Sequence, residues 1–395
     1  MVSFLLLIIY LAFISLGLPD SLLGAGWPVI SQNLHVPLSY AGIVSMIIAF
    51  CTILSSLASN RITHKLGVGV VTVISVGLTA IALLGKSLAP NFLCICLWAI
   101  PYGFGAGGVD AALNNYVAIH FKARHMSWLH CFWGIGASIS PYIMGYCLLK
   151  NNNWRGGYST VSYIQFGLFA LILCSFPFLQ KYNRKTISKK NGDDHQTKYI
   201  SINKALHLKG VPFVLISFFS YCALETTAGL WATTYLNTYR GIDADIAARF
   251  ASLFYLGITF GRFINGFIAE KMGDKRTIRM GIGITAIGII LIVLPISSNI
   301  LSLIGLIVVG LGCAPIYPSI IHSTPYNFGK ENSQAIVGIQ MASAYTGSTF
   351  MPLLFGLLFS KVNISCYPLY LFIFVILMAV SNELLNKTIS KNKNK

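Results

Sequence analysis

Three of the eleven acidic residues lie inside long apolar stretches of this 395-residue chain. They are Asp20, Asp110 and Glu225. An unpaired charge at the centre of a bilayer costs on the order of 2.5–3.5 kcal/mol, so an acid at that depth is functional by default. Burial favours the protonated form of a carboxylic acid, which suits a group that binds and releases a proton. The other reading of each acid is a hydrogen-bonded tie between helices, and we favour the functional one.

Two further polar residues could act together with Asp110. Asn114 follows it by four residues, so both side chains fall on one face of a helix. His130 and Asp110 lie at similar distances on either side of a turn at 120–123, so they reach nearly the same depth. A hydrogen bond between Asp110 and His130 is one expectation. Contact of His130 with a backbone carbonyl is the other, and the sequence leaves both open.

Aromatic and amide side chains near the acids could hold a sugar, with a flat ring under its C–H face. Each of these aromatic residues taken alone is more often a packing or interface residue. No Lys or Arg lies deep in the stretches that hold the three acids, which argues against an anion carrier. We expect Arg262, in a different stretch, to brace neighbouring helices. The added candidates are Trp27, Trp133, Trp231, Gln340 and Tyr345.

Twelve apolar stretches must position these residues, and each could cross about 30 Å of hydrocarbon as a helix. Only 10% of the residues are charged, against roughly a quarter in soluble domains. The stretches are apolar on all sides, unlike the alternating strands of a membrane barrel. The sequence therefore predicts an all-α integral membrane protein with twelve transmembrane helices. The predicted spans are 4–30, 36–58, 67–85, 92–119, 123–149, 158–179, 211–237, 246–269, 277–297, 300–321, 333–360 and 364–385.

The net charge of +17 is distributed unevenly along the chain. With both termini on one side, 21 of the 28 Lys and Arg residues fall on that side, and five fall in the opposite loops, among them Lys86. The positive-inside rule then predicts a multi-pass protein of the cell (cytoplasmic) membrane with both termini cytoplasmic. The basic residues are scattered without interleaved aromatics, so we expect a lipid bilayer rather than a nucleic acid as partner.

A polar stretch divides the chain into two halves that resemble each other. The predicted domains are an N-terminal six-helix half at 1–180, a cytoplasmic linker at 181–210, and a C-terminal half with a short basic tail at 211–395. The repeated elements are Lys65-Leu66-Gly67 and Lys271-Met272-Gly273, Gly103-Phe104-Gly105 and Gly310-Leu311-Gly312, and the spaced sets Gly136, Pro141, Gly145 and Gly347, Pro352, Gly356. This repetition resembles the plan of the major facilitator superfamily, two parallel six-helix halves around a central cavity.

The remaining sequence motifs do not indicate a nucleotide-binding, metal-binding or catalytic site. The G-x-G-x-x-G match at 103–108 lies within an apolar helix without a preceding strand, which excludes a nucleotide site. The nine Cys are spread through the spans and are typical of small buried hydrophobes. No combination of nucleophile, base and orienting group is present. We therefore expect no enzyme activity, no cofactor and no metal.

Three segments resemble the fucose–proton symporter branch of the major facilitator superfamily and its sodium-dependent glucose transporter-like relatives. They are the stretches 17–24 (GLPDSLLG), 105–114 (GAGGVDAALN) and 129–136 (LHCFWGIG). The resemblance implies that Asp20 and Asp110 occupy the places of the family's two essential carboxylates. One would serve proton coupling and the other substrate binding and gating, while Asn114 and His130 would line the same cavity. The chain departs from the fucose carriers at Asp110, Asn115 and His130, where they have Glu, Pro and Gln.

These features predict a secondary active transporter that imports a neutral, monosaccharide-like sugar with a cation, which we expect to be H⁺. One alternative is a proton-coupled drug or metabolite exporter of the same superfamily, although the usual Gly-Pro step and Gly pair of its fifth helix are absent. Another alternative is a non-transporting membrane sensor, which would need a larger cytosolic output domain. The sequence leaves the direction of transport and the choice between H⁺ and Na⁺ open. We expect a monomer.

Overall fold

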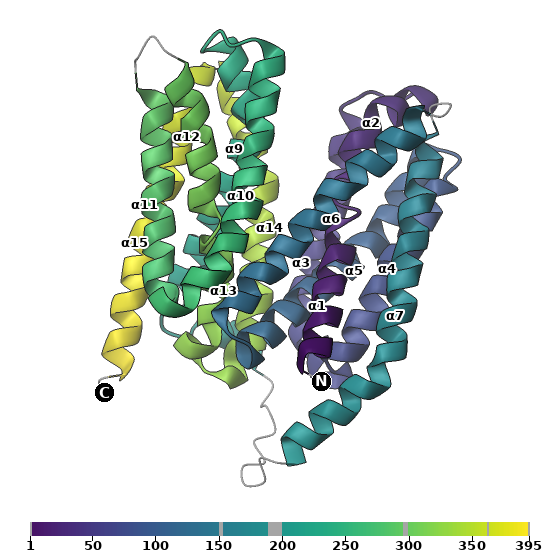
Figure 1. Ribbon diagram of the computed structural model, residues 1–395, viewed down its shortest axis with the longest axis vertical. Helices are drawn as coiled ribbons and strands as arrows, with labels where there is room; N and C mark the ends of the chain where they lie inside the picture. Colours follow the sequence, from purple (N-terminus) through teal and green to yellow (C-terminus); the bar gives the residue numbers. More distant parts are fainter. Residues whose placement is uncertain (1, 150–152, 189–199, 295–298, 362, 394–395) are drawn as a thin grey trace. The chain divides into compact units, whose positions relative to one another are not determined.

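The computed structural model describes residues 2–149, 153–188, 200–294, 299–361 and 363–393. The chain within these ranges is helical, as Figure 1 shows. The first part of the chain forms the helices α1 (Val2–Gly17), α2 (Leu22–Asn33), α3 (Tyr40–Leu66), α4 (Val68–Ser87), α5 (Phe92–His120), α6 (Ala123–Leu149) and α7 (Trp154–Ser188). They are followed by α8 (Ile202–Leu206), α9 (Val211–Thr238), α10 (Ala244–Met272), α11 (Asp274–Val293), α12 (Ile300–Cys313), α13 (Ile316–Phe328), α14 (Lys330–Lys361), the 3-10 helix η1 (Ile364–Cys366) and α15 (Tyr367–Lys393).

Eleven segments of the described chain are helical, long enough and apolar enough to cross a membrane. The remaining predicted span, 333–360, coincides with α14, a 32-residue helix that is not among the eleven. The all-α prediction is confirmed. Two predicted spans are interrupted, since 4–30 divides into α1 and α2, and 300–321 divides into α12 and α13 and continues to Phe328.

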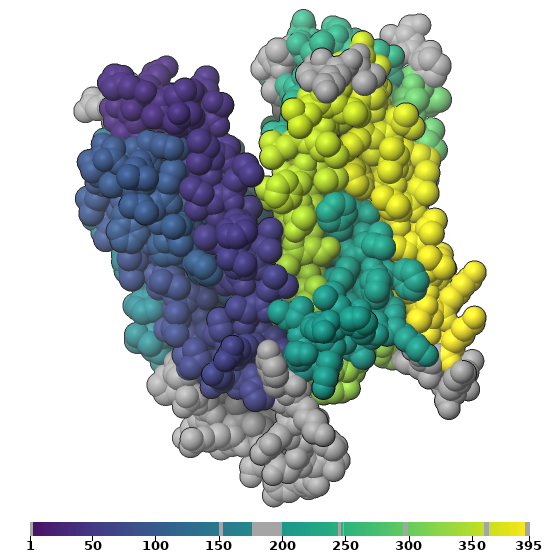
Figure 2. Space-filling model, turned by 180° about the vertical axis from the view of Figure 1, so that it is seen from behind, coloured from purple at the N-terminus to yellow at the C-terminus, as the bar shows by residue number. Residues whose placement is uncertain are grey.

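The chain forms two compact units. Unit 1 comprises Met1–Tyr116 and Leu129–Ile200, and unit 2 comprises Val117–Trp128 and Ser201–Lys395. The segment Val117–Trp128, which joins α5 to α6, thus groups with unit 2 although the sequence predicts it within the N-terminal half. Within unit 1, α4 runs along α7 (Figure 1). Within unit 2, α9 packs against both α14 and α15, and the short helix α8 lies beside α14 (Figure 2).

The repeated glycines Gly103 and Gly310 take the same structural role in the two units. A Cβ at Gly103 would lie 2.6 Å from the carbonyl oxygen of Ile48, so α5 and α3 approach backbone to backbone. At the corresponding place in unit 2, a Cβ at Gly310 would collide with the carbonyl oxygen of Phe254, because α12 approaches α10 equally closely. Small residues permit this close helix packing, which explains why the sequence repeats them.

The first repeated element forms the same tight turn in both units. Gly67 ends α3 with φ +80° and ψ 154°, and Gly273 ends α10 with φ +75° and ψ 154°. Residues with a Cβ rarely adopt a positive φ, so glycine is required at both helix junctions. The Lys-x-Gly repeat thus marks where one helix ends and the next begins one residue later.

Candidate functional site

The break between α1 and α2 positions the first acid. Pro19 has no backbone N–H to continue the helical ladder, and the chain passes through a turn in which the N–H of Asp20 donates to the Gly17 carbonyl over 3.2 Å. The helix resumes at Leu22. The side chain of Asp20 is exposed at this turn, although it lies in the middle of an apolar 31-residue segment.

Each oxygen of the Asp20 carboxylate accepts one hydrogen bond. The Tyr102 hydroxyl of α5 donates to Oδ1 over 2.8 Å, and the Trp133 indole N–H of α6 donates to Oδ2 over 2.9 Å. Glycines set the position of Trp133, because a Cβ at Gly17 would collide with the Trp133 carbonyl oxygen and one at Gly136 would collide with the backbone of α1. The close approach of α1 and α6 therefore delivers an aromatic ring and a donor to the acid.

The second acid belongs to a buried polar relay. Asp110 is 4% exposed, and its Oδ1 accepts a 2.7 Å hydrogen bond from the Asn114 amide one turn further along α5. The Asn114 side-chain oxygen lies 3.0 Å from His130 Nε2 on α6, so this nitrogen carries the proton. Asn114 therefore bridges the acid and the imidazole.

One face of α6 joins the two acidic groups. His130 and Trp133 are three residues apart and thus neighbours on the helix surface. The ring of Phe13 on α1 meets His130 edge to face, with 5.4 Å between the ring centroids. The relay of Asp110 and the hydrogen-bonded Asp20 are thus both built from α1, α5 and α6 of unit 1.

The third acid lies in unit 2 and forms an ion pair. Glu225 on α9 accepts a 3.2 Å hydrogen bond from Arg262 on α10, which is 3% exposed and also reaches the Tyr221 hydroxyl at 3.4 Å. A buried guanidinium requires an anion nearby. Pairing of this kind corresponds to the interhelical tie that was the alternative reading of Glu225.

Two of the predicted tryptophans make hydrogen bonds to backbone. Trp27 on α2 is buried in the apolar core of unit 1 and donates its indole N–H to the Leu38 carbonyl over 2.7 Å. Trp231 on α9 donates to the Pro352 carbonyl of α14 over 3.0 Å. In this geometry both residues contribute to packing, and Trp133 is the one of the three whose N–H reaches a carboxylate.

The last two predicted residues lie on α14. Gln340 is fully buried, and its side-chain oxygen accepts a 3.1 Å hydrogen bond from the Thr324 hydroxyl of α13. Its Nε2 has no hydrogen-bond partner in the described part of the chain. Tyr345, further along α14, is half-buried. Both residues belong to unit 2, whereas Asp20 and Asp110 belong to unit 1.

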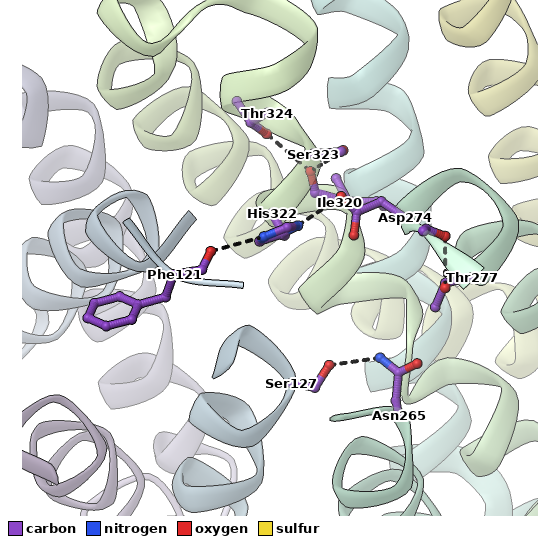
Figure 3. A network of polar contacts seen from close by, with 10 residues as sticks. Phe121, Ser127, Asn265, Asp274, Thr277, Ile320, His322, Ser323 and Thr324 are labelled. Carbon is purple, nitrogen blue, oxygen red and sulfur yellow. Dashed lines mark hydrogen bonds and ion pairs between the residues drawn. The ribbon is translucent and has the colours of Figure 1, made fainter. Parts of the chain in front are cut away.

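The structure adds residues that sequence reasoning missed. No sequence pattern singles out Tyr102 on α5, and only the fold brings its hydroxyl to Asp20. In unit 2, His322 contacts Asp274 over 2.8 Å and the Phe121 carbonyl over 3.2 Å, as Figure 3 shows. The sequence does not predict the contact between His322 and Asp274, because the two residues are 48 positions apart. Among the described residues, no cluster of three His, Cys, Asp or Glu side chains could hold a metal ion.

Comparison with known proteins places the chain in a family. A model described as Major Facilitator Superfamily matches residues 9–248 and 213–386. Bypass of stop codon protein 6 of Saccharomyces cerevisiae is 22% identical over 95% of this chain and 81% of its own length. The glucose/mannose transporter GlcP of Bacillus subtilis is 24% identical over 68% of this chain and 66% of its own length.

Solved structures share the fold at low sequence identity. The fucose:proton symporter FucP of E. coli superposes with a TM-score of 0.76 at 13% identity, covering 96% of this chain and 98% of the other. The proton:xylose symporter XylE superposes with a TM-score of 0.77 at 13% identity, covering 97% and 95%. With the family model matching most of the helical segments, the chain belongs to the Major Facilitator Superfamily and is a multi-pass secondary transporter rather than an enzyme.

Proposed function

We propose that the protein imports a neutral, monosaccharide-like sugar together with a proton. The observation that carries the proposal is that α5 and α6 supply the partners of two unlike acids, Asp20 in the turn after α1 and Asp110 on α5. Asp20 is exposed and hydrogen-bonded by Trp133, whereas Asp110 is buried and connected through Asn114 to His130. An exposed acceptor and a buried titratable relay are the two parts that a sugar–proton symporter needs.

The sugar would bind at Asp20. Its two oxygens each hold one donor and retain lone pairs for sugar hydroxyls. The indole of Trp133 supplies a flat apolar surface beside them. No Lys or Arg side chain donates to Asp20 in the described part of the chain, which suits an uncharged ligand. The named sugar carriers among the relatives, GlcP, FucP and XylE, support this substrate class.

The proton would bind at Asp110. In a site only 4% exposed, the neutral form of the acid avoids the desolvation cost of a charge. Protonation gives the acid one O–H donor while its other oxygen still accepts, so a proton on Oδ1 would require the hydrogen bond from Asn114 to be remade, and the contact with His130 with it. A change in the protonation state of Asp110 would thereby move His130, and through α6 it would alter the position of Trp133 beside the sugar. Alternating access would then carry the neutralised, loaded carrier through the membrane.

We further propose a monomer in the cell membrane, with both termini in the cytoplasm. The excess of Lys and Arg in one set of loops and in the tail supports this orientation of the termini. Orientation can be measured by labelling single cysteines placed near residues 60 and 155 from either side. Labelling of the first site only from inside, and of the second only from outside, is the expected result.

Asp110→Asn tests the proton assignment. The amide keeps the volume of the acid but cannot release a proton, so uphill proton-driven uptake into proteoliposomes should be lost while exchange of labelled sugar persists. Full accumulation by the variant would disprove the assignment. Glu383→Gln is a matched control, because that acid lies in an exposed ion pair with Arg279.

The substrate follows from counterflow of radiolabelled sugars at two pH values, with and without Na⁺. A sugar that exchanges and accumulates with a pH gradient alone would support the proposal. Accumulation that needs Na⁺ would replace the proton by sodium. Extrusion of a hydrophobic cation would favour the exporter, and ligand binding without any flux would favour the sensor.

A further inference from the structure

A buried lysine lies beside the Asp20 site. The sequence predicts Lys86 in an outer loop. In the structure it instead occupies the last turn of α4 and is 3% exposed. Among the described residues it forms no ion pair with an acid. A buried ammonium without a compensating partner is costly, so its surroundings need to be accounted for.

The surroundings of Lys86 are a ring and a thiol. Its Nζ lies over the Tyr102 ring, 4.6 Å from the centroid, in the geometry of a cation–π contact. The buried thiol of Cys96 is close enough to interact electrostatically with the ammonium. Tyr158, on α7, is close enough to Tyr102 to interact with it electrostatically. These Tyr and Cys side chains are neutral in their ordinary protonation states, so none of them supplies a negative charge to Lys86.

The nearest acid is reached through Tyr102 itself. The ring that lies under the Lys86 ammonium carries the hydroxyl that donates to Asp20 over 2.8 Å. Tyr102 is buried, so its orientation is fixed by these two contacts and by packing. One aromatic ring therefore has a cation on its face and a carboxylate at its hydroxyl.

We infer that Lys86 is a positioning residue of the Asp20 site. Its ammonium holds the Tyr102 ring in the orientation that directs the hydroxyl at Asp20. The inference rests on the proposed function only in taking Asp20 as the sugar acceptor. The contact between Lys86 and the Tyr102 ring is itself independent of the substrate.

Transport measurements test the positioning role. Lys86→Met keeps the apolar stem and removes the charge, and it should raise the KM for the sugar at least about tenfold with a smaller effect on the maximal rate. Lys86→Arg keeps the charge and should restore the KM to within about threefold. A Lys86→Arg variant as impaired as Lys86→Met, or an unchanged KM in Lys86→Met, would overturn the inference.

The route through Tyr102 can be tested separately. Tyr102→Phe keeps the ring but removes the hydroxyl that reaches Asp20. If Lys86 acts through that hydroxyl, adding Lys86→Met to Tyr102→Phe should change the KM by no more than about twofold. Effects that multiply in the double variant would show that Lys86 acts by another route.

A stability cycle needs no substrate and therefore stays informative if the sugar assignment fails. If the ammonium holds the Tyr102 ring, the Tm changes caused by Lys86→Met and by Tyr102→Leu should not add in the double variant. Tm changes that add would overturn the positioning role. Lys204→Met, on the exposed face of α8, serves as the control and should leave the Tm unchanged.

Discussion

The side-chain amide of Asn114 donates a 2.7 Å hydrogen bond to Asp110 from one helical turn away. The same side chain turns its oxygen to His130, so a single amide holds both titratable groups. This arrangement makes Asn114 the structural centre of the proposed proton site.

Replacement of Asn114 by leucine should therefore damage both stability and coupling. Asp110 and His130 would each lose a buried hydrogen bond, which costs about 1–3 kcal/mol in stability. Uphill uptake should fall more than exchange, because the relay is needed for proton transfer. Thermal unfolding in detergent and a comparison of uptake with counterflow check the two parts. Unchanged pH-driven accumulation would contradict the role of Asn114.

The indoles of Trp133 and Trp27 allow a matched comparison. Trp133→Phe keeps an aromatic ring but removes the N–H donated to Asp20, so sugar affinity should fall about tenfold or more, as expected for a hydrogen bond to a charged group. Trp27→Phe loses a bond to a backbone carbonyl and should affect stability with little change in affinity. Sugar binding measured by counterflow distinguishes the two variants, and equal losses of affinity would disprove the distinction.

Glu225→Gln should destabilise the protein by about 2–3 kcal/mol. The change leaves the Arg262 guanidinium, 3% exposed, without its anion, and the cost is moderated because the Glu225 side chain retains 19% exposure. Denaturant unfolding measures the effect. The exposed pair of Arg279 and Glu383, at 53% and 45% exposure, provides the comparison, since Glu383→Gln should cost less than about 1 kcal/mol. Similar losses at both sites would contradict the structural role of Glu225.

Gly136→Ala should impair transport by separating α6 from α1. Its Cβ would collide with the Ile14 carbonyl oxygen, and the displaced α6 would draw Trp133 away from Asp20. Gly145→Ala on the same helix meets no atom within 4 Å and should be neutral or slightly stabilising, because alanine favours helix. Uptake and Tm of the two variants can be compared directly. Impairment by both would show that the helix itself, rather than the close contact, is sensitive.

Much of the helical architecture can be predicted from the amino-acid sequence, because a membrane strongly constrains any segment that crosses it. A segment that crosses lipid must satisfy its own backbone and be apolar for about twenty residues, so composition alone predicts helices and their approximate bounds. Close packing of helices leaves no room for a larger side chain at Gly103 or Gly310, and these two glycines have matching roles in the two units. The span predicted at 4–30 is divided in the structure at Pro19 and Asp20, because proline cannot continue the helical ladder.

The partners of the buried residues required the tertiary structure. Asp110 and Asn114 are neighbours by helical spacing alone, but Tyr102 reaches Asp20 across 82 residues and Trp133 reaches it across 113. Lys86 reads as a loop residue by its place at the end of a span, yet packing turns its side chain into the protein. The sequence determined which residues are too polar for the membrane. Only the packing of one helix against another decided which of them meet, because that depends on helix rotation and close approach, which no local pattern records.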